Sequence, residues 1–142
     1  MCLKLFKTEL FHGDEIEIMV EAKSWIPVKT LRFIRDPFNY NIFKIMLQMN
    51  LQVTFGDVGY AGLFIDDEEN PRILLKTDLP FGYTFKGEAD IHNVSYGEHR
   101  LTIKMKSEQG KPFRNTLMEI YVIRYPTLYE LTGQIAIWSF MT

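Results

Sequence analysis

Residues 43–55 read FKIMLQMNLQVTF, and apolar and polar side chains alternate along almost the whole stretch. Every odd-numbered position carries an apolar residue, whereas Met46 is the one apolar residue at an even-numbered position. Because successive side chains of a β-strand point to opposite faces, this period of two predicts a strand with one buried and one solvated face. One-sided burial of this kind is typical of an antiparallel sheet.

A helical pattern competes with the strand over the first part of this stretch. The apolar residues at helical spacing are Phe38, Ile42, Ile45, Met46 and Met49. The alternation continues to Phe55, past the point at which the helical spacing ends, so we favour the strand. Because a strand of this length exceeds the usual limit of about ten residues, we expect a bend or bulge within it.

Similar stretches, bounded by Gly, Pro, Asn and Asp, recur along the chain. The predicted strands are 3–11, 15–22, 28–35, 43–55, 60–65, 72–77, 83–91, 99–106 and 134–141, and 113–125 is predicted to form a hairpin. Short strands with closely spaced turns predict an all-β protein. We therefore expect residues 1–142 to form one domain, a two-sheet antiparallel β-sandwich of jelly-roll type. The predicted core comprises Ile16, Ile18, Val20, Ile45, Leu47, Leu51, Val53, Leu101 and Ile103.

The composition is that of an ordinary globular protein, with 46% hydrophobic and 24% charged residues. The net charge of −2 offers no broad basic field to nucleic acid. Cys2 is the single cysteine, which excludes an internal disulfide and a cysteine zinc cage. The N-terminus lacks the apolar region of a signal peptide, and no apolar run is long enough to span a bilayer. These features predict a cytoplasmic or virion protein without nucleic-acid partner, membrane insertion or cofactor.

Two groups of residues are candidates for metal binding. The acidic run 66–70 (DDEEN) offers oxygen ligands for calcium. It lacks the spaced Asp-x-Asp-x-Asp-Gly order, so we favour a solvated hairpin tip and leave cation binding open. Asp90, His92 and His99 would form a metal site if they converged. No metal-binding spacing supports this, and His99 lies on the apolar face of its strand, so we expect a buried, hydrogen-bonded histidine.

No catalytic residue is predicted. The chain contains neither a Gly-x-Ser-x-Gly motif nor a glycine-rich phosphate loop. A glycosidase with two distant carboxylates leaves no local signature, and this alternative stays open.

Aromatic residues make up 14% of the chain, and several lie in or beside predicted loops. Exposed rings stack on sugar faces or anchor protein interfaces. The residues predicted to bind a ligand are Trp25, Tyr60, Phe81, Tyr83 and Tyr96. The closing strand, 134–141, is apolar on both faces, so we also predict self-association through Trp138 and Phe140.

Three stretches resemble the later strands of jelly-roll modules: LFIDD at 63–67, DIHNVSYGEHRLTIK at 90–104 and RNTLMEIYV at 114–122. The resemblance is to tumour-necrosis-factor/C1q-like and galactose-binding-like modules, including viral structural ones. It implies a fold but carries over no binding residue, because the calcium and sugar ligands of the carbohydrate modules have no counterparts here.

The leading hypothesis is a non-enzymatic binding or assembly module, such as a structural or attachment protein of a virus particle, with a glycan or a surface protein as partner. One alternative is a carbohydrate-binding module that uses loop aromatics. The other is a small metal-dependent enzyme built on Asp90, His92 and His99.

Overall fold

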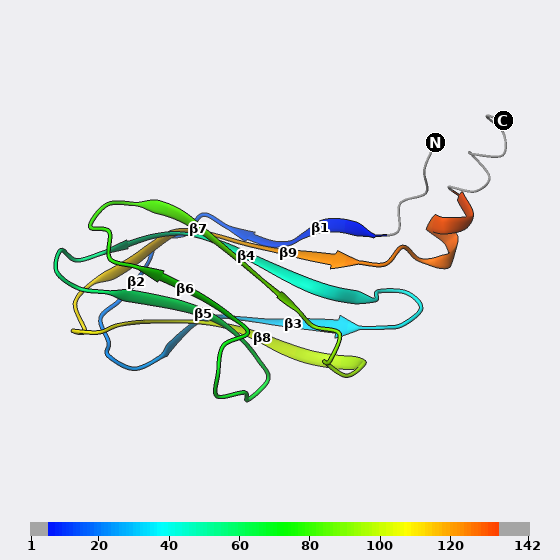
Figure 1. Cartoon of the computed structure of the whole chain (residues 1–142), viewed down its shortest axis with the longest axis horizontal. Helices are drawn as coiled ribbons and strands as arrows, with labels where there is room; N and C mark the ends of the chain where they lie inside the picture. Colours follow the sequence, from blue (N-terminus) through cyan, green and yellow to red (C-terminus); the bar gives the residue numbers. More distant parts are fainter. Residues whose placement is uncertain (1–5, 134–142) are drawn as a thin grey trace.

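The computed structural model describes residues 6–133, and nearly all of this part of the chain is strand or turn (Figure 1). The strands are β1 (Lys7–Asp14), β2 (Ile18–Val20), β3 (Ile26–Arg35), β4 (Ile42–Val53), β5 (Gly59–Ile65), β6 (Ile73–Thr77), β7 (Tyr83–Asp90), β8 (Gly97–Ser107) and β9 (Phe113–Arg124). A short helical segment at 128–133 follows β9. No helix within residues 6–133 is long and apolar enough to cross a membrane.

The strands form two stacked sheets (Figure 1). One sheet has the order β1-β9-β4-β7, with β2 also paired to β9, and the other has the order β3-β8-β5-β6. All of these pairings are antiparallel. The chain passes from one sheet to the other at most connections, so strands distant in sequence become neighbours. The predicted all-β, two-sheet antiparallel sandwich is confirmed, and the interleaved strand order is that of a jelly roll.

β4 has the predicted orientation over most of its length. The buried residues of β4 at odd-numbered positions are Ile45, Leu47, Met49, Leu51 and Val53. The expected irregularity is also present, because the register with β9 shifts between Ile42 and Lys44 and again between Asn50 and Leu51. At the first shift Ile42, rather than Phe43, enters the core. Phe55 lies beyond the end of β4 and is 82% exposed, so the predicted strand was two residues too long at this end.

The rest of the predicted core is confirmed except at its N-terminal end. The remaining buried members are Val20, Leu101 and Ile103, and Ile18 packs against the core while partly exposed. Ile16 is 63% exposed, which contradicts the prediction. The predicted strand 15–22 is interrupted here, because the Ile16 amide donates to Asp14 Oδ1 (3.1 Å) in a turn before β2. The polypeptide therefore re-enters the sheet only at Ile18.

The stretch 113–125 was predicted as a hairpin, and this prediction is wrong. It forms a single strand, β9, which pairs with β1 and β2 on one side and with β4 on the other. A central strand gains hydrogen bonds along both edges, which favours continuing the strand over forming a turn. The predicted closing strand 134–141, with Trp138 and Phe140, lies outside the described residues, so self-association stays a prediction.

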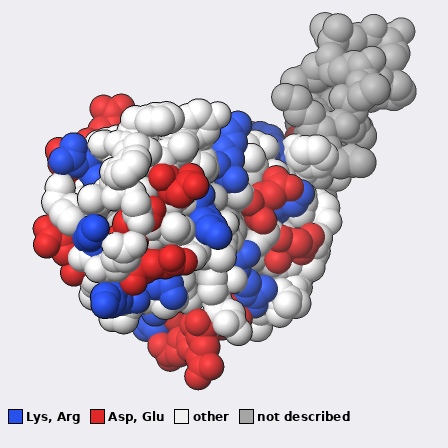
Figure 2. All heavy atoms as spheres, turned by 60° about the vertical axis from the view of Figure 1, so that its left-hand side comes forward, with Lys and Arg blue, Asp and Glu red and all other residues white. Residues whose placement is uncertain are grey.

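Charged side chains of both signs are intermixed on the surface. Figure 2 shows Lys and Arg beside Asp and Glu over the face in view, in keeping with the net charge of −2. No field of a single sign covers that face.

Candidate functional site

The outer face of the β3-β8-β5-β6 sheet carries an aromatic residue between two lysines. The inward residues of β5 are Ala61, Leu63 and Ile65, so Tyr60 points to the opposite, outer face. Tyr60 is directly opposite Lys106 on β8 and Lys76 on β6. Directly opposite side chains of an antiparallel sheet contact one another. The row Lys106–Tyr60–Lys76 therefore crosses the face.

The next outward position of β5 is Gly62, which is buried beneath neighbouring side chains. A Cβ placed there would lie 3.0 Å from Phe64 Cε1, 3.0 Å from Pro71 Cβ and 3.4 Å from Trp25 Cη2. Trp25 immediately precedes β3, and its ring meets that of Phe64 edge to face, with centroids 5.2 Å apart. Because Gly62 has no side chain, rings from two elements and a loop proline converge over the strand.

Lysine ammonium groups lie close to these rings. Lys106 Nζ is 4.5 Å from the Trp25 ring centroid and 5.7 Å from that of Tyr60. Lys104 Nζ lies 4.5 Å from the centroid of Phe64. These distances are within the range of a cation–π interaction, so the ring faces orient the lysine side chains.

Trp25 and Pro71 from this cluster also line a groove with a polar rim. Its volume is about 420 Å³, and the lining residues include Trp25, Tyr60, Asn70, Leu74, Lys106 and Glu108. We call it the Trp25–Tyr60 groove. The Tyr60 hydroxyl donates to Glu108 Oε1 (2.6 Å), and this hydrogen bond raises the pKa of Tyr60 above its ordinary value. The same hydrogen bond orients the Glu108 carboxylate at the rim.

The structure thus brings together two of the five predicted ligand-binding aromatics, Trp25 and Tyr60. Tyr83 begins β7, in the other sheet, where its ring meets that of Phe85 (5.2 Å between centroids), and Phe81 precedes this strand. Tyr96 lies just before β8, where the Arg35 guanidinium is 4.7 Å from its ring centroid. Phe81, Tyr83 and Tyr96 do not line the Trp25–Tyr60 groove.

Sequence reasoning did not assign Lys106 or Glu108 to this site. Lys106 belongs to the polar positions of an alternating strand, a pattern that by itself indicates only a solvated face. Its position beside Tyr60 depends on the pairing of β5 with β8, which are distant in sequence.

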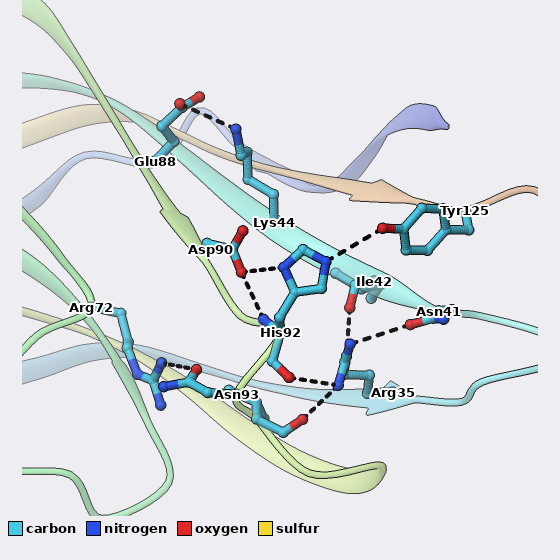
Figure 3. Close-up of polar contacts among 11 residues, drawn as sticks. Arg35, Asn41, Ile42, Lys44, Arg72, Glu88, Asp90, His92, Asn93 and Tyr125 are labelled. Carbon is cyan, nitrogen blue, oxygen red and sulfur yellow. Dashed lines mark hydrogen bonds and ion pairs between the residues drawn. The ribbon is translucent and has the colours of Figure 1, made fainter. Parts of the chain in front are cut away.

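The three residues of the candidate metal triad do not converge, because His92 pairs with Asp90 whereas His99 pairs with Asp66. His92 Nδ1 lies 2.5 Å from Asp90 Oδ1, and Nε2 faces the Tyr125 hydroxyl (Figure 3). The His92 ring also stacks on Phe43. His99 instead pairs with Asp66, with 2.7 Å between Nδ1 and Oδ2. Among residues 6–133, no group of three His, Cys, Asp or Glu side chains is placed to hold a metal ion.

The acidic connection between β5 and β6 is exposed, as predicted for 66–70, but the carboxylates of Asp66, Asp67 and Glu68 are paired. Asp66 has a positive φ of 53° and accepts the Arg100 amide (2.9 Å). Asp67 pairs with the Arg100 guanidinium (2.5 Å). Glu68 accepts two hydrogen bonds of 2.8 Å from Arg72, which also donates to Asn93 Oδ1 (Figure 3). These contacts hold the segment that leads to Pro71 and the groove.

Comparisons with known proteins leave the family open. No protein-family model matches the chain, and no curated protein matches it. Among solved structures, the chain is similar to one described as "EclA C-terminal domain; sugar-binding protein", with a TM-score of 0.46 and 10% identity over 79% of this chain and 81% of that chain. At this level of similarity, a function for this chain can follow only from its own residues.

Proposed function

We propose that the chain is a non-enzymatic carbohydrate-binding module whose site is the Trp25–Tyr60 groove. The observation that carries the proposal is the convergence of Trp25 and Tyr60, from different parts of the sequence, on one groove with a polar rim. An aromatic ring packs well against the apolar C–H face of a sugar. Side chains at the rim then select the orientation of the hydroxyl groups.

The rim contains the hydrogen-bonding groups that a sugar requires. The Glu108 carboxylate accepts hydrogen bonds, the Lys106 ammonium donates them, and the Asn70 amide does both. The volume of about 420 Å³ lies within the usual range for small-molecule sites, roughly 300–1,000 Å³. One or two sugar rings are the natural size of ligand for such a groove.

Binding without turnover is consistent with the polar contacts around the groove. Ser107 lines it, but its hydroxyl donates to the Lys111 carbonyl oxygen (2.9 Å) rather than to a histidine. His92 and His99 are engaged with Asp90 and Asp66, outside the lining of the groove. Within the described residues, no serine–histidine pair lines the groove, and its two carboxylates belong to Glu69 and Glu108.

A glycan array followed by titration calorimetry tests this proposal. We expect the full chain to bind at least one class of glycan, and Tyr60→Ala to weaken that binding about tenfold through loss of a stacking surface. Trp25→Ala should act in the same direction. Tyr83→Ala and Tyr96→Ala are matched controls, because each removes a half-exposed ring outside the groove.

Two results would contradict the proposal. One is the absence of glycan binding by a folded wild-type protein. The other is an equal loss of affinity in the Tyr83→Ala or Tyr96→Ala variant, which would move the site away from the groove. Thermal melting of each variant separates loss of binding from loss of folding.

A further inference from the structure

Two lysines line the Trp25–Tyr60 groove and two more lie on the same face of the sheet, and their positive charge indicates the class of ligand. Lys23 and Lys106 line the groove, Lys76 is opposite Tyr60, and Lys104 is opposite Gly62. We propose that the ligand is an acidic saccharide and that these lysines bind its carboxylate or sulfate group. This inference rests on the proposed function.

The first argument is that these charges are unpaired within the protein. Some lysines elsewhere form ion pairs, such as Lys29 with Asp14 (3.5 Å) and Lys44 with Glu88 (3.4 Å), whereas Lys86 and Lys111 form none within the described residues. Within residues 6–133, the four groove lysines have no carboxylate oxygen within 4.0 Å of the ammonium nitrogen. An anion entering the groove would therefore not have to displace an internal partner.

The second argument is that aromatic rings hold three of these lysines in place. Lys106 lies over Trp25, Lys104 over Phe64, and Lys76 over Tyr60 at 5.9 Å from the ring centroid. A ring face attracts the ammonium group but does not neutralise its charge. The remaining N–H groups stay available to donate to a ligand, and an orientation that is already fixed reduces the entropy lost on binding.

The third argument concerns the acidic groups at the same groove. Glu69 and Glu108 also line it, and Glu108 accepts the Tyr60 hydroxyl (2.6 Å). The closely spaced phosphates of a nucleic acid would be repelled by these two carboxylates. A saccharide separates its charged groups by whole sugar rings, and its hydroxyls can donate to Glu69 and Glu108. The mixed rim therefore favours an acidic saccharide over a nucleic acid.

The test compares ligands that differ only in charge. Calorimetry with the full chain would use oligogalacturonate and its methyl ester, heparin oligosaccharide and its desulfated form, and oligothymidine. We expect at least one charged saccharide to bind about tenfold more tightly than its neutralised form. We expect this preference to shrink as salt is raised from about 50 to about 500 mM, because salt screens exposed charges.

Lys106→Met keeps an apolar stem over Trp25 but removes the charge, so it should abolish most of the preference for the charged form. Lys86→Met is the matched control, since Lys86 belongs to β7, in the other sheet, and does not line the groove. Lys86→Met should leave the preference unchanged.

Three outcomes would overturn the inference in distinguishable ways. Equal binding of charged and neutral saccharides would overturn the acidic ligand while leaving the proposed function intact. Tighter binding of oligothymidine than of any saccharide would overturn it in favour of nucleic acid. No binding of any saccharide, here or on the glycan array, would overturn both this inference and the proposed function.

Discussion

His99 and Asp66 form a hydrogen-bonded pair that links the start of β8 to the connection after β5, with His99 Nδ1 2.7 Å from Asp66 Oδ2. The other ring nitrogen of His99, Nε2, lies 2.7 Å from the Ser95 carbonyl oxygen. Both partners are acceptors, and only the imidazolium form can donate from both nitrogens at once. The folded protein therefore favours protonated His99.

This geometry predicts a pH dependence of stability near neutrality. Burial alone lowers the pKa of His99, but the hydrogen bonds to Asp66 and Ser95 outweigh it and leave the pKa above its ordinary value of 6.5. The stabilisation is therefore complete below about pH 6.5 and is lost as the pH rises through the folded-state pKa. We expect the Tm measured by circular dichroism to fall as the pH is raised above about 6.5.

Asp66 acts at the other end of the pH range. Burial raises its pKa, but hydrogen bonds from His99 and from the Arg100 amide outweigh this and lower the pKa below 3.8. The stability that ionised Asp66 supplies is therefore complete above its ordinary pKa and is lost as the pH falls through the lowered pKa.

The substitution His99→Gln should flatten the fall in Tm near neutrality, whereas the variant His92→Gln should still show that fall. An unchanged slope in His99→Gln would contradict the assignment.

Leu51 and Gln52 test the orientation of β4. Leu51 is fully buried, so Leu51→Ala should lower the free energy of unfolding by roughly 2–5 kcal/mol. Gln52 is partly exposed and donates to the Pro80 carbonyl oxygen (2.9 Å), so Gln52→Ala should cost roughly 1 kcal/mol or less. Urea unfolding of both variants measures the difference. Equal costs would mean that the register of β4 is displaced by one residue.

Arg35 and Arg32 on β3 test the difference between a buried and an exposed guanidinium. Arg35 is 5% exposed and donates to the carbonyl oxygens of Ile42 and Val94, both at 2.6 Å (Figure 3). Lysine cannot reproduce this forked geometry, so Arg35→Lys should lower the free energy of unfolding by about 2 kcal/mol.

Arg32 is the matched control, because its ion pair with Glu98 (2.7 Å) is solvent-exposed. Arg32→Lys should cost less than about 1 kcal/mol. Chemical denaturation distinguishes the two, and similar costs for both substitutions would contradict a structural role for the Arg35 hydrogen bonds.

Gly62 tests the packing beneath Trp25 and Pro71, which line the Trp25–Tyr60 groove. In Gly62→Ala the new Cβ would approach Phe64 and Pro71 to 3.0 Å and Trp25 to 3.4 Å, so these groups must shift. We expect weaker glycan binding and a changed emission from Trp25, read in a Trp138→Phe background that leaves one tryptophan. Gly13→Ala is the control, since its Cβ would meet Leu10 at an ordinary 3.6 Å. Unchanged emission and affinity in Gly62→Ala would contradict this close packing of Phe64, Pro71 and Trp25 over Gly62.

The sequence by itself determined the class of fold and the inward face of its longest strand. In β4 the alternation of apolar and polar residues is local information, since each side chain's face follows from its neighbours along the chain. Ile45, Leu47, Leu51 and Val53 were therefore predictable as core. Local periodicity did not reveal that 113–125 would continue as one strand, because that depends on partners on both sides, in β1, β2 and β4.

Only the tertiary structure decided which polar and aromatic residues share a site. Tyr60 lies beside Lys106 because β5 pairs with β8, and the Trp25 ring, just before β3, lies near Gly62 and Lys106 and lines the same groove as Tyr60. His99 was separated from His92 in the same way, through a contact with Asp66 on a different connection. Such neighbours are set by strand pairing between distant segments, for which a single sequence carries no local signal. That is why the aromatics were predictable as candidates, whereas the groove that joins two of them was not.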